Sequence, residues 1–372
     1  MWTRAALGLR IRRTLEGFDA YGWETPSRDI AAEVGLRPEQ IVRLDTNTSP
    51  YPPLPELRAL AKGAQRLEVN QYPDTTYLEL REGLSRYCRL GVERFVVTNG
   101  ADEGLDITVK VLLDNGDEVV VPSPTYSMFA VASELMGARV KRVWRDPEDF
   151  AISADKVLHE VGQKTRLVFL CNPNSPTGNA TPLSEVEKIA AETKATLVVD
   201  EAYHEFGGAT SAGLTEKYDN VVVCRTFSKA FSMAGVRVGY LIAGKETVEQ
   251  LNLARPPNSL TVPSLFLAQA ALRNLGEMRR NVERISRERS RVFEALSAAG
   301  SVSPFPSVTN FVLFRVEGGA SKAKALQRAL MRKGLVLRAY SEASRVGDCL
   351  RLTIGTRAVN SRVVAAIREA SR

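Results

Sequence analysis

A lysine in the second half of the chain has the surroundings that covalent amine chemistry needs. Lys229 follows the β-branched run Val221–Arg225, and hydroxyl side chains precede it at Thr226 and Ser228. Burial near a strand end lowers the pKa of a lysine, and the neutral amine can form a Schiff base with a carbonyl compound. A lysine in a surface loop is the commoner situation, so Lys229 alone indicates no activity.

A carboxylate ends another strand-like run. Asp200 is the last residue of Thr196–Asp200, and Tyr203 follows it closely. A carboxylate can keep the nitrogen of a bound heterocycle protonated, which makes that ring an electron sink, and a phenol can bond a ring hydroxyl. Structural roles are equally open, because Asp200 could cap a turn and Tyr203 could be an ordinary core residue.

The start of a predicted helix offers a site for an anion. Gly100-Ala101-Asp102 follows the run Arg94–Thr98, and free backbone N–H groups at a helix start attract phosphate. Arg237 could add a bidentate contact, and the ring of Tyr126 could lie on a flat ligand. A lysine, a carboxylate, a phenol, an aromatic platform and a phosphate cup together predict pyridoxal 5′-phosphate.

The elements that must position these residues form a predicted α/β sheet. Helix-like segments, such as Asp102–Asp114, Tyr126–Met136 and Leu183–Thr193, alternate with apolar runs. The runs are Arg94–Thr98, Glu118–Val121, Val140–Trp144, Leu167–Cys171, Thr196–Asp200, Val221–Arg225 and Val238–Ile242. This alternation predicts a mostly parallel sheet covered on both faces, with one antiparallel strand at the last two runs. Ligands bind at the carboxyl ends of such strands.

A second, smaller α+β domain is predicted downstream. Pro256, Pro257 and Pro263 interrupt the pattern before a helical tract at Leu265–Ala299. Strand-like runs follow at Asn310–Val316, Leu335–Tyr340 and Leu350–Ile354. We predict an N-terminal segment, 1–48, that joins the small domain, a large cofactor-binding domain, 49–262, and an interdomain helix with the small domain, 263–372.

Composition excludes several classes of protein. The chain has 372 residues and a net charge of +7, with 20 basic and 8 acidic residues in Ala271–Arg372. No apolar run is long enough to span a membrane, and the arginine-containing start, 1–13, has no leader pattern. Four scattered cysteines and two histidines argue against a metal centre or a disulfide scaffold and favour the cytoplasm. We expect no nucleic-acid partner.

Several motifs occur in an order that resembles a known family. They are YPD (Tyr72–Asp74), NGADE (Asn99–Glu103), PTY (Pro124–Tyr126), NPNSPTG (Asn172–Gly178), DEAYHEF (Asp200–Phe206), RTFSKAFSMAGVRVGY (Arg225–Tyr240) and LRLTIGT (Leu350–Thr356). Together they resemble the fold-type I, class II aminotransferases, which use pyridoxal phosphate, and are most similar to the histidinol-phosphate branch of that family. The resemblance implies a large domain with a mostly parallel seven-stranded sheet and a smaller α+β domain.

The resemblance implies a role for each residue around the cofactor. Lys229 would bond the cofactor and carry a proton, Asp200 would pair with the pyridine nitrogen, and Tyr203 would contact the ring oxygen. Tyr126 would stack on the ring. The implied phosphate ligands are Ala101, Asp102, Thr226, Ser228 and Arg237. Tyr72 would reach the phosphate in a partner subunit, which requires a homodimer with shared active sites.

The resemblance also implies a substrate site. Arg351 would clamp a carboxylate, and Arg338 would contact a substrate phosphate. Two departures from the family pattern occur near this site. Ser175 stands where the family has an asparagine, so we expect Asn174 to replace that contact, and Asn47 begins the segment Asn47–Tyr51 that helps to line the substrate pocket.

The implied reaction converts L-histidinol phosphate and 2-oxoglutarate to imidazole-acetol phosphate and L-glutamate, in histidine biosynthesis. An aminotransferase for aromatic amino acids and a threonine-phosphate decarboxylase are alternatives on the same scaffold. A regulatory protein on an inactive form of this fold is a further alternative, which the presence of Lys229 disfavours.

Overall fold

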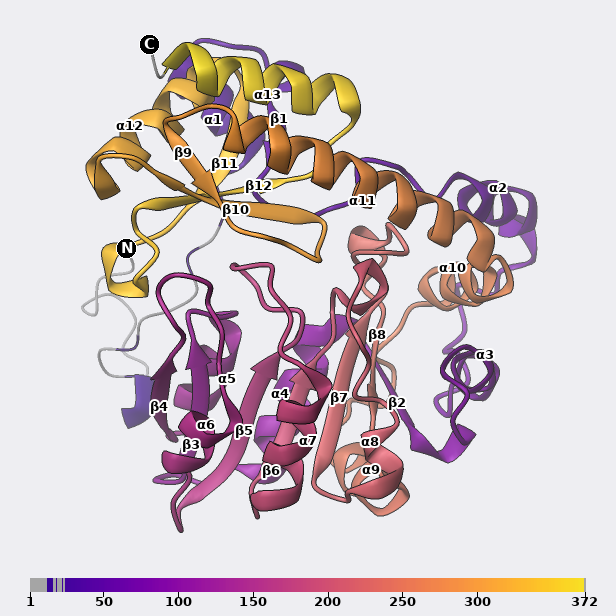
Figure 1. Cartoon of the computed structure of the whole chain (residues 1–372). Coiled ribbons are helices and arrows are strands. Elements are labelled where there is room, and N and C mark those ends of the chain that lie inside the picture. Colours follow the sequence, from indigo (N-terminus) through magenta and orange to yellow (C-terminus); the bar gives the residue numbers. More distant parts are fainter. Residues whose placement is uncertain (1–11, 16–17, 19–21, 23, 371–372) are drawn as a thin grey trace.

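The computed structural model describes residues 12–15, 18, 22 and 24–370, and it contains two β-sheets (Figure 1). The larger sheet lies below the smaller one in this view, and its parallel strands point their carboxyl ends toward the smaller sheet. Most of the segment 1–13, where we expected no leader, lies outside the described residues.

The larger sheet has seven strands in the order β2-β8-β7-β6-β5-β3-β4. Their bounds are β2 (Phe95–Thr98), β3 (Glu118–Ser123), β4 (Arg139–Trp144), β5 (Thr165–Cys171), β6 (Thr196–Asp200), β7 (Val221–Thr226) and β8 (Gly239–Ile242). Strand β8 is antiparallel to both β2 and β7, and the other neighbouring pairs are parallel. The predicted mostly parallel sheet is therefore confirmed, including the one antiparallel strand.

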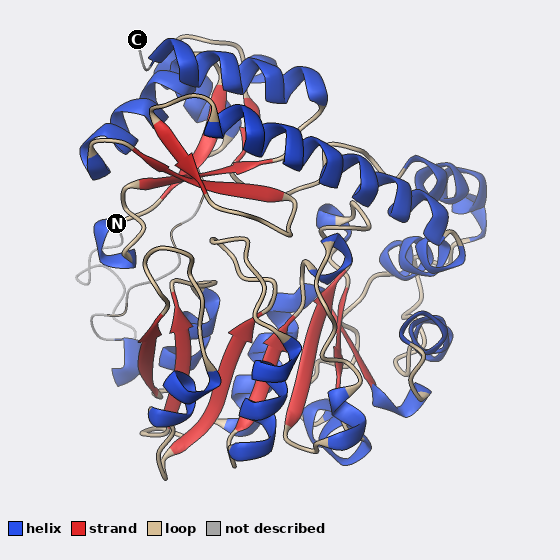
Figure 2. Ribbon diagram, in the orientation of Figure 1, coloured by secondary structure: helices blue, strands red, loops and turns tan. Residues whose placement is uncertain are grey.

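Both faces of the larger sheet are buried because its strands alternate apolar side chains between two cores. In β3, Val119 and Val121 pack in one cluster while Val120 packs in the other. Helices cover each face, as Figure 2 shows, with α4 (Gly100–Leu112), α5 (Met128–Leu135) and α9 (Lys245–Asn252) in the cluster of Val119. This double cover explains why the strands have continuous apolar runs.

The remaining helices cover the other face of the larger sheet, connect the two sheets or pack on the smaller one. They are α1 (Ser27–Val34), α2 (Leu54–Gly63), α3 (Leu78–Cys88), α6 (Ala154–His159), α7 (Leu183–Glu192), α8 (Leu214–Lys217), α10 (Val262–Arg273), α11 (Leu275–Ser297), α12 (Gly319–Arg332) and α13 (Arg357–Ala370). In the described part of the chain, no helix has the length and hydropathy of a membrane span.

The smaller sheet combines β1, from the first part of the chain, with four strands from the last part of the chain. Its order is β1-β11-β12-β10-β9, with bounds β1 (Val42–Leu44), β9 (Val302–Pro304), β10 (Phe311–Val316), β11 (Leu335–Ala339) and β12 (Cys349–Thr353). Strand β1 pairs in parallel with β11, and the other pairs are antiparallel. Residues just after β1 thereby lie beside the carboxyl ends of the larger sheet.

The helical tract expected at Leu265–Ala299 is two helices, and this part of the prediction was wrong. Asn274 leaves helical geometry between α10 and α11. Pro263, which we expected to interrupt structure, lies in the first turn of α10, where its missing N–H costs nothing. The oxygen of Thr261 accepts a hydrogen bond from the backbone N–H of Ser264 and caps the start of that helix.

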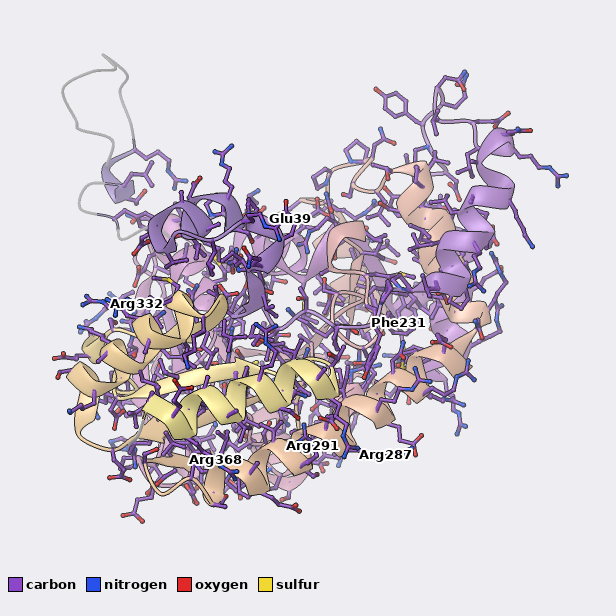
Figure 3. The ribbon with its side chains drawn as sticks, turned by 90° about the horizontal axis from the view of Figure 1, so that it is seen from above. Glu39, Phe231, Arg287, Arg291, Arg332 and Arg368 are labelled. Carbon is purple, nitrogen blue, oxygen red and sulfur yellow. The ribbon has the colours of Figure 1, made fainter. Side chains whose placement is uncertain are left out.

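The basic excess of the C-terminal region lies partly on the outer helices of the smaller sheet. Figure 3 labels Arg287 and Arg291 on α11, Arg332 on α12 and Arg368 on α13. Arg287 pairs with Glu283 and Arg291 pairs with Glu288 along α11. These two arginines take part in surface ion pairs, and all four lie outside the linings of the cavities described below.

Candidate active site

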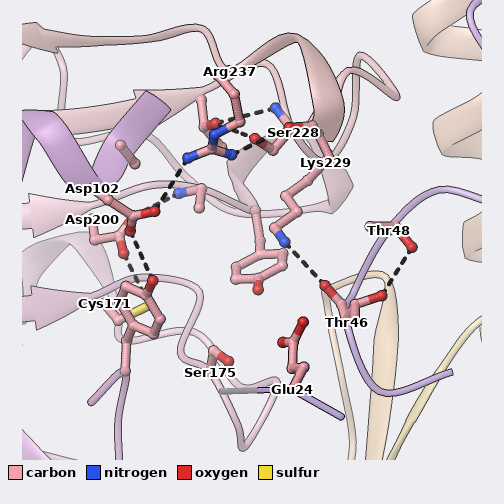
Figure 4. A pocket seen from close by; sticks show the side chains of 16 residues that line it. Glu24, Thr46, Thr48, Asp102, Cys171, Ser175, Asp200, Ser228, Lys229 and Arg237 are labelled. Carbon is pink, nitrogen blue, oxygen red and sulfur yellow. Dashed lines mark hydrogen bonds and ion pairs between the residues drawn. The ribbon is translucent and has the colours of Figure 1, made fainter. Parts of the chain in front are cut away.

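A cavity of about 350 Å³ opens at the carboxyl ends of the larger sheet (Figure 4). It lies where β5, β6 and β7 end, at the carboxyl ends of parallel strands, where the sequence analysis expected a ligand site. Its lining includes nine predicted site residues: Ala101, Asp102, Tyr126, Asp200, Tyr203, Thr226, Ser228, Lys229 and Arg237. The structure therefore brings Lys229 and Asp200, from different strand ends, to one cavity.

Lys229 enters the cavity from the loop after β7. Its Nζ donates a hydrogen bond of 3.4 Å to the carbonyl oxygen of Thr46 and lies 5.8 Å from the ring centre of Tyr203. Burial lowers the pKa of Lys229 to about 8, with a further contribution from the positive charge of Arg351. A substantial fraction of this amine is therefore neutral near physiological pH, as a nucleophile or general base requires.

The carboxylate of Asp200 is buried and lines the first cavity. The backbone N–H of Ala202 donates to its Oδ1 at 3.0 Å, and Sγ of Cys171 lies 3.9 Å from its Oδ2. Burial raises the pKa of Asp200 to about 7, because these contacts compensate little of the lost hydration. A cationic N–H group in the cavity would favour the ionised carboxylate, so Asp200 suits a protonated ring nitrogen.

Tyr203 is held in place by the smaller sheet. Nδ2 of Asn47 donates to its hydroxyl at 2.9 Å, and its ring packs edge-on against Phe311 at 5.3 Å. Asn47 is itself fixed, because its N–H donates to Oγ1 of Thr353 and its carbonyl accepts from Asn310. Burial raises the pKa of Tyr203 to about 12, so this phenol stays protonated and can donate a hydrogen bond.

The first turn of α4 forms a shallow cup. A Cβ added to Gly239 would lie 2.5 Å from the carbonyl carbon of Gly100 and 2.7 Å from the nitrogen of Ala101. Strand β8 therefore approaches the turn backbone to backbone. Arg237, at a positive φ of 57°, places its guanidinium over Gly100, with Nη2 3.2 Å from Oδ2 of Asp102.

Hydroxyl groups complete the cup. Oγ1 of Thr226 and Oγ of Ser228 lie 2.9 Å apart, and the N–H of Ser228 donates to Oγ1 of Thr226. The hydroxyl of Tyr126 donates to Oδ1 of Asp102 at 2.8 Å, which fixes its ring at the rim of the cavity. Backbone N–H groups, hydroxyls and a guanidinium are the donors that a phosphate group requires.

A second cavity of about 440 Å³ continues from the first, toward the smaller sheet. Both cavities contain Lys229, Tyr203 and Ser175 in their linings, so they meet at the amine. Arg338 of β11 and Arg351 of β12 line the second cavity and are direct partners across the antiparallel pair. Like charges placed opposite each other repel, so this position favours an anionic ligand.

Arg351 is positioned by neighbours on both sides. Its Nη1 donates to Oγ of Ser175 at 3.2 Å, and its Nη2 donates to the carbonyl oxygen of Asp45 at 2.6 Å. Its buried Nε has no hydrogen-bond partner among the described residues. The guanidinium is therefore oriented toward the cavity with donor capacity remaining for a ligand.

The expectation that Asn174 faces the ring is corrected by the structure. Asn174 is fully buried outside the cavity lining, where Nδ2 donates to the carbonyl of Pro124 and to Thr177, and Oδ1 accepts from Thr125. These bonds hold the turn together and occupy both N–H groups and the oxygen of the amide. Ser175, the next residue, lines both cavities instead.

Tyr72 lies apart from the cavity residues within this chain. Its side chain is 83% exposed, in the segment between α2 and α3. An exposed position is what a contact to another subunit requires, so its proposed role stays a prediction.

Sequence reasoning missed several lining residues, and two of them, Thr46 and Glu24, matter for the site. Thr46 supplies the carbonyl for Lys229, and Glu24 lines both cavities. Thr46 precedes Asn47, which the motif comparison singled out, so it could have been found from that motif. Glu24 lies in a segment without hydrophobic periodicity and outside the family motifs, so the sequence does not indicate that it belongs to the site.

The residues of the first cavity fit pyridoxal 5′-phosphate. A backbone cradle at Gly239 suits a phosphate, the buried carboxylate of Asp200 suits a protonated ring nitrogen, and Lys229 suits an aldehyde carbon. The described donor set agrees with the cofactor that the sequence predicted.

Comparison with known proteins identifies the family. The family model of aminotransferase class I and II matches residues 39–367. The chain belongs to the class I and II aminotransferases. Two histidinol-phosphate aminotransferases are similar to this aminotransferase at 36% identity. The similarity to the one from Ruminiclostridium cellulolyticum covers 86% of this chain and 90% of that protein, and the similarity to the one from Methanosarcina mazei covers 96% and 95%.

Solved structures agree with this family. The histidinol-phosphate aminotransferase of Sinorhizobium meliloti, in complex with pyridoxal 5′-phosphate, superposes with a TM-score of 0.89 at 25% identity and covers 99% of each chain. The L-threonine-O-3-phosphate decarboxylase of Porphyromonas gingivalis has a TM-score of 0.75 at 19% identity, over 88% of this chain and 99% of that one, which shows a shared fold alone. The sequence prediction of the family and of its fold is confirmed for this aminotransferase.

Proposed function

We propose that this enzyme transfers an amino group from L-histidinol phosphate to 2-oxoglutarate, giving imidazole-acetol phosphate and L-glutamate, as a step of histidine biosynthesis. The observation that carries the proposal is the pair Arg338 and Arg351, which face one cavity next to Lys229. The pair suits a phosphate on one substrate and the two carboxylates of the other. The names of the similar proteins support the same reaction.

We propose pyridoxal 5′-phosphate as the cofactor of the first cavity. When bound, it supplies an electron sink for negative charge at the α-carbon of the substrate. Asp200 would hold the ring nitrogen protonated, Tyr203 would donate to the ring oxygen, and Tyr126 would cover one face of the ring. The proposed phosphate ligands are the backbone of Ala101 and Asp102, the hydroxyls of Thr226 and Ser228, and the guanidinium of Arg237.

Lys229 is the proposed acid and base. Its Nζ would take the proton from the substrate α-carbon as a general base and would then, as a general acid, deliver it to the C4′ carbon of the cofactor. A pKa near 8 lets the amine accept and release this proton close to physiological pH. The carbonyl of Thr46 orients the amine toward the junction of the two cavities.

Arg351 and Arg338 are the proposed substrate clamp. Arg351 would bind the α-carboxylate of glutamate and share the phosphate of histidinol phosphate with Arg338. Ser175 and the carbonyl of Asp45 fix the guanidinium of Arg351, so less rotamer entropy is lost on binding. Asn47 lines the same cavity, and its side chain orients Tyr203. Asn47 would therefore contact the substrate and also position a residue that contacts the cofactor.

We propose that the enzyme is a cytoplasmic homodimer with shared active sites. Large apolar side chains are exposed at Leu54 and Leu57 of α2, Val69 and Tyr72 of the following segment, and Leu78 of α3. Exposed apolar side chains along this part of the chain support a protein interface, and Tyr72 would extend from it to the partner's phosphate cup. The four unpaired cysteines support a reducing compartment.

A half-reaction screen of the purified holoenzyme tests the proposal. L-histidinol phosphate, phenylalanine, tyrosine and O-phosphothreonine are added singly while the visible spectrum of the cofactor is followed. We expect conversion of the cofactor with histidinol phosphate, at a kcat/KM well above that for phenylalanine. A preference for phenylalanine would favour an aromatic aminotransferase, and CO₂ release from O-phosphothreonine would favour a decarboxylase.

A further inference from the structure

The second cavity contains more cationic than anionic groups. Lys229, Arg338 and Arg351 line it, and these groups meet the amino, phosphate and carboxylate groups of the two proposed substrates. Histidinol phosphate also has an imidazole ring with an N–H donor. A donor brought into a cavity without an acceptor loses its hydration at a cost, so the enzyme needs an acceptor there.

Two carboxylates line this cavity, and one is already engaged. Asp45 accepts two hydrogen bonds from Arg43, at 2.8 and 2.7 Å. Glu24 has no hydrogen bond or ion pair to another described residue, although its negative charge, after the hydrogen bond to Asp45, helps to raise the pKa of Arg43, and it lines both cavities. Figure 4 shows its carboxylate directed into the space between Ser175 and Thr46.

The backbone beside Glu24 is tied to the smaller sheet. Nη1 of Arg43, in β1, donates to the carbonyl oxygen of Thr25 at 2.9 Å. The same guanidinium holds Asp45, which precedes the Thr46 carbonyl that Lys229 contacts. Arg43 thus connects the backbone next to Glu24, an exposed residue of the cavity lining, with the segment that supplies the Thr46 carbonyl.

We propose that Glu24 determines substrate specificity by accepting a hydrogen bond from the ring N–H of the amino donor. This inference rests on the proposed function and names one more residue for it. A phenyl ring offers no N–H, so Glu24 gains nothing from a phenylalanine-like substrate. The negative charge of Glu24 also opposes the side-chain carboxylate of glutamate, which Arg338 must then attract.

The test compares two substrates that differ only in the ring. Kinetics of the holoenzyme are measured with L-histidinol phosphate and with L-phenylalaninol phosphate. Glu24→Ala should lower kcat/KM for histidinol phosphate roughly tenfold, mostly through KM, because the contact is remote from the reacting atoms. For phenylalaninol phosphate the change should be under about twofold, and Glu24→Gln, which keeps a neutral acceptor oxygen, should lose less than Glu24→Ala.

A matched control is available on α1. Glu33→Ala removes an exposed carboxylate that lines neither cavity, and both substrates should be converted as by the wild type. An equal effect of Glu24→Ala on the two substrates, or no effect on either, would overturn the inference. If the wild type fails to convert histidinol phosphate, the proposed function itself is wrong, and that result is read before any variant is made.

Discussion

The two walls of the active site differ in how they carry charge. The wall from the larger sheet holds Asp200, which is buried, and Lys229, which is partly buried, and the loss of hydration moves the pKa of each toward neutrality. The wall from the smaller sheet places Arg338 and Arg351 opposite each other at partly exposed positions. Groups that move protons need a low dielectric, whereas groups that bind dianions must stay charged and accessible. The comparison predicts that variants of the first wall lower kcat and variants of the second raise KM.

The largest effect is expected from Lys229→Ala. Loss of the proton carrier should lower kcat roughly 10⁴-fold or more, since acid–base and covalent contributions are both removed. Steady-state assays with glutamate and a 2-oxo acid measure this change. Lys245→Ala, at the exposed start of α9, is the control and should retain full activity. A Lys229→Ala enzyme with more than a tenth of wild-type kcat would contradict the assignment.

Asp200→Asn should come next. An amide cannot hold a proton on the ring nitrogen as a carboxylate does, so kcat should fall roughly 10²-fold or more, with little change in KM. The variant should still take up the cofactor through its phosphate cup, which absorbance measures. A kcat equal to that of the wild type would show that Asp200 is structural.

Arg351→Ala tests the other wall. Removing a bidentate partner of a carboxylate costs about 3 kcal/mol, so KM for glutamate should rise roughly 10²-fold while kcat changes less. Arg315→Ala is the control, because Arg315 of β10 pairs with Asp348 and lines neither cavity. If Arg351→Ala lowered kcat and left KM unchanged, the proposed division between proton transfer at one wall and substrate binding at the other would be wrong.

Arg338→Ala should have a smaller and more selective effect. We expect KM for histidinol phosphate to rise about tenfold and KM for phenylalanine to change less than about twofold, because only the first carries a phosphate. Parallel assays with the two amino donors measure the ratio. Equal changes for both would assign Arg338 to general packing of β11.

The smallest expected effect is a pH dependence of stability in the cofactor-free chain. The amine of Lys229 has a pKa of about 8 in the folded chain, against an ordinary value of 10.5, so the unfolded chain binds more protons between these values. The free energy of unfolding of the wild type therefore gains a contribution as pH rises from 8 to 10.5.

Below pH 8 the wild type bears the full cost of a buried charge. Lys229→Ala should then be more stable than the wild type at about pH 7, by on the order of 2 kcal/mol, and should lose this advantage by pH 10.5. Urea unfolding of both cofactor-free chains across this range measures the difference. A difference that does not vary with pH would mean that the amine is hydrated when the chain is folded.

The strand ends of the larger sheet could be predicted because its strands are buried on both faces. Continuous apolar runs such as Leu167–Cys171 identify such strands, and sheet geometry then requires Lys229 and Asp200 to meet at one edge. The three-residue strands β1 and β9 contain too little pattern to be recognised, since their pairing depends on tertiary contacts.

Single positions within turns could not be predicted in the same way. Whether Asn174 or Ser175 faces the cavity depends on local hydrogen bonds, which occupy both N–H groups and the oxygen of the Asn174 amide. Glu24 lies beside Thr25, whose carbonyl oxygen accepts a hydrogen bond from Arg43 of β1. Neither outcome follows from residue spacing, because both depend on contacts between segments.

The close approach of Gly239 to the first turn of α4 has a consequence for engineering. The spacing between β8 and Gly100–Ala101 is set by two main chains in direct contact, with no side chain between them. No rotamer change can absorb an added methyl group there, so Gly239→Ala would displace the helix start itself. The dimensions of the anion pocket are thus fixed by polypeptide geometry, and redesign for a bulkier or smaller phosphorylated cofactor would have to begin with the strand rather than with the pocket's side chains.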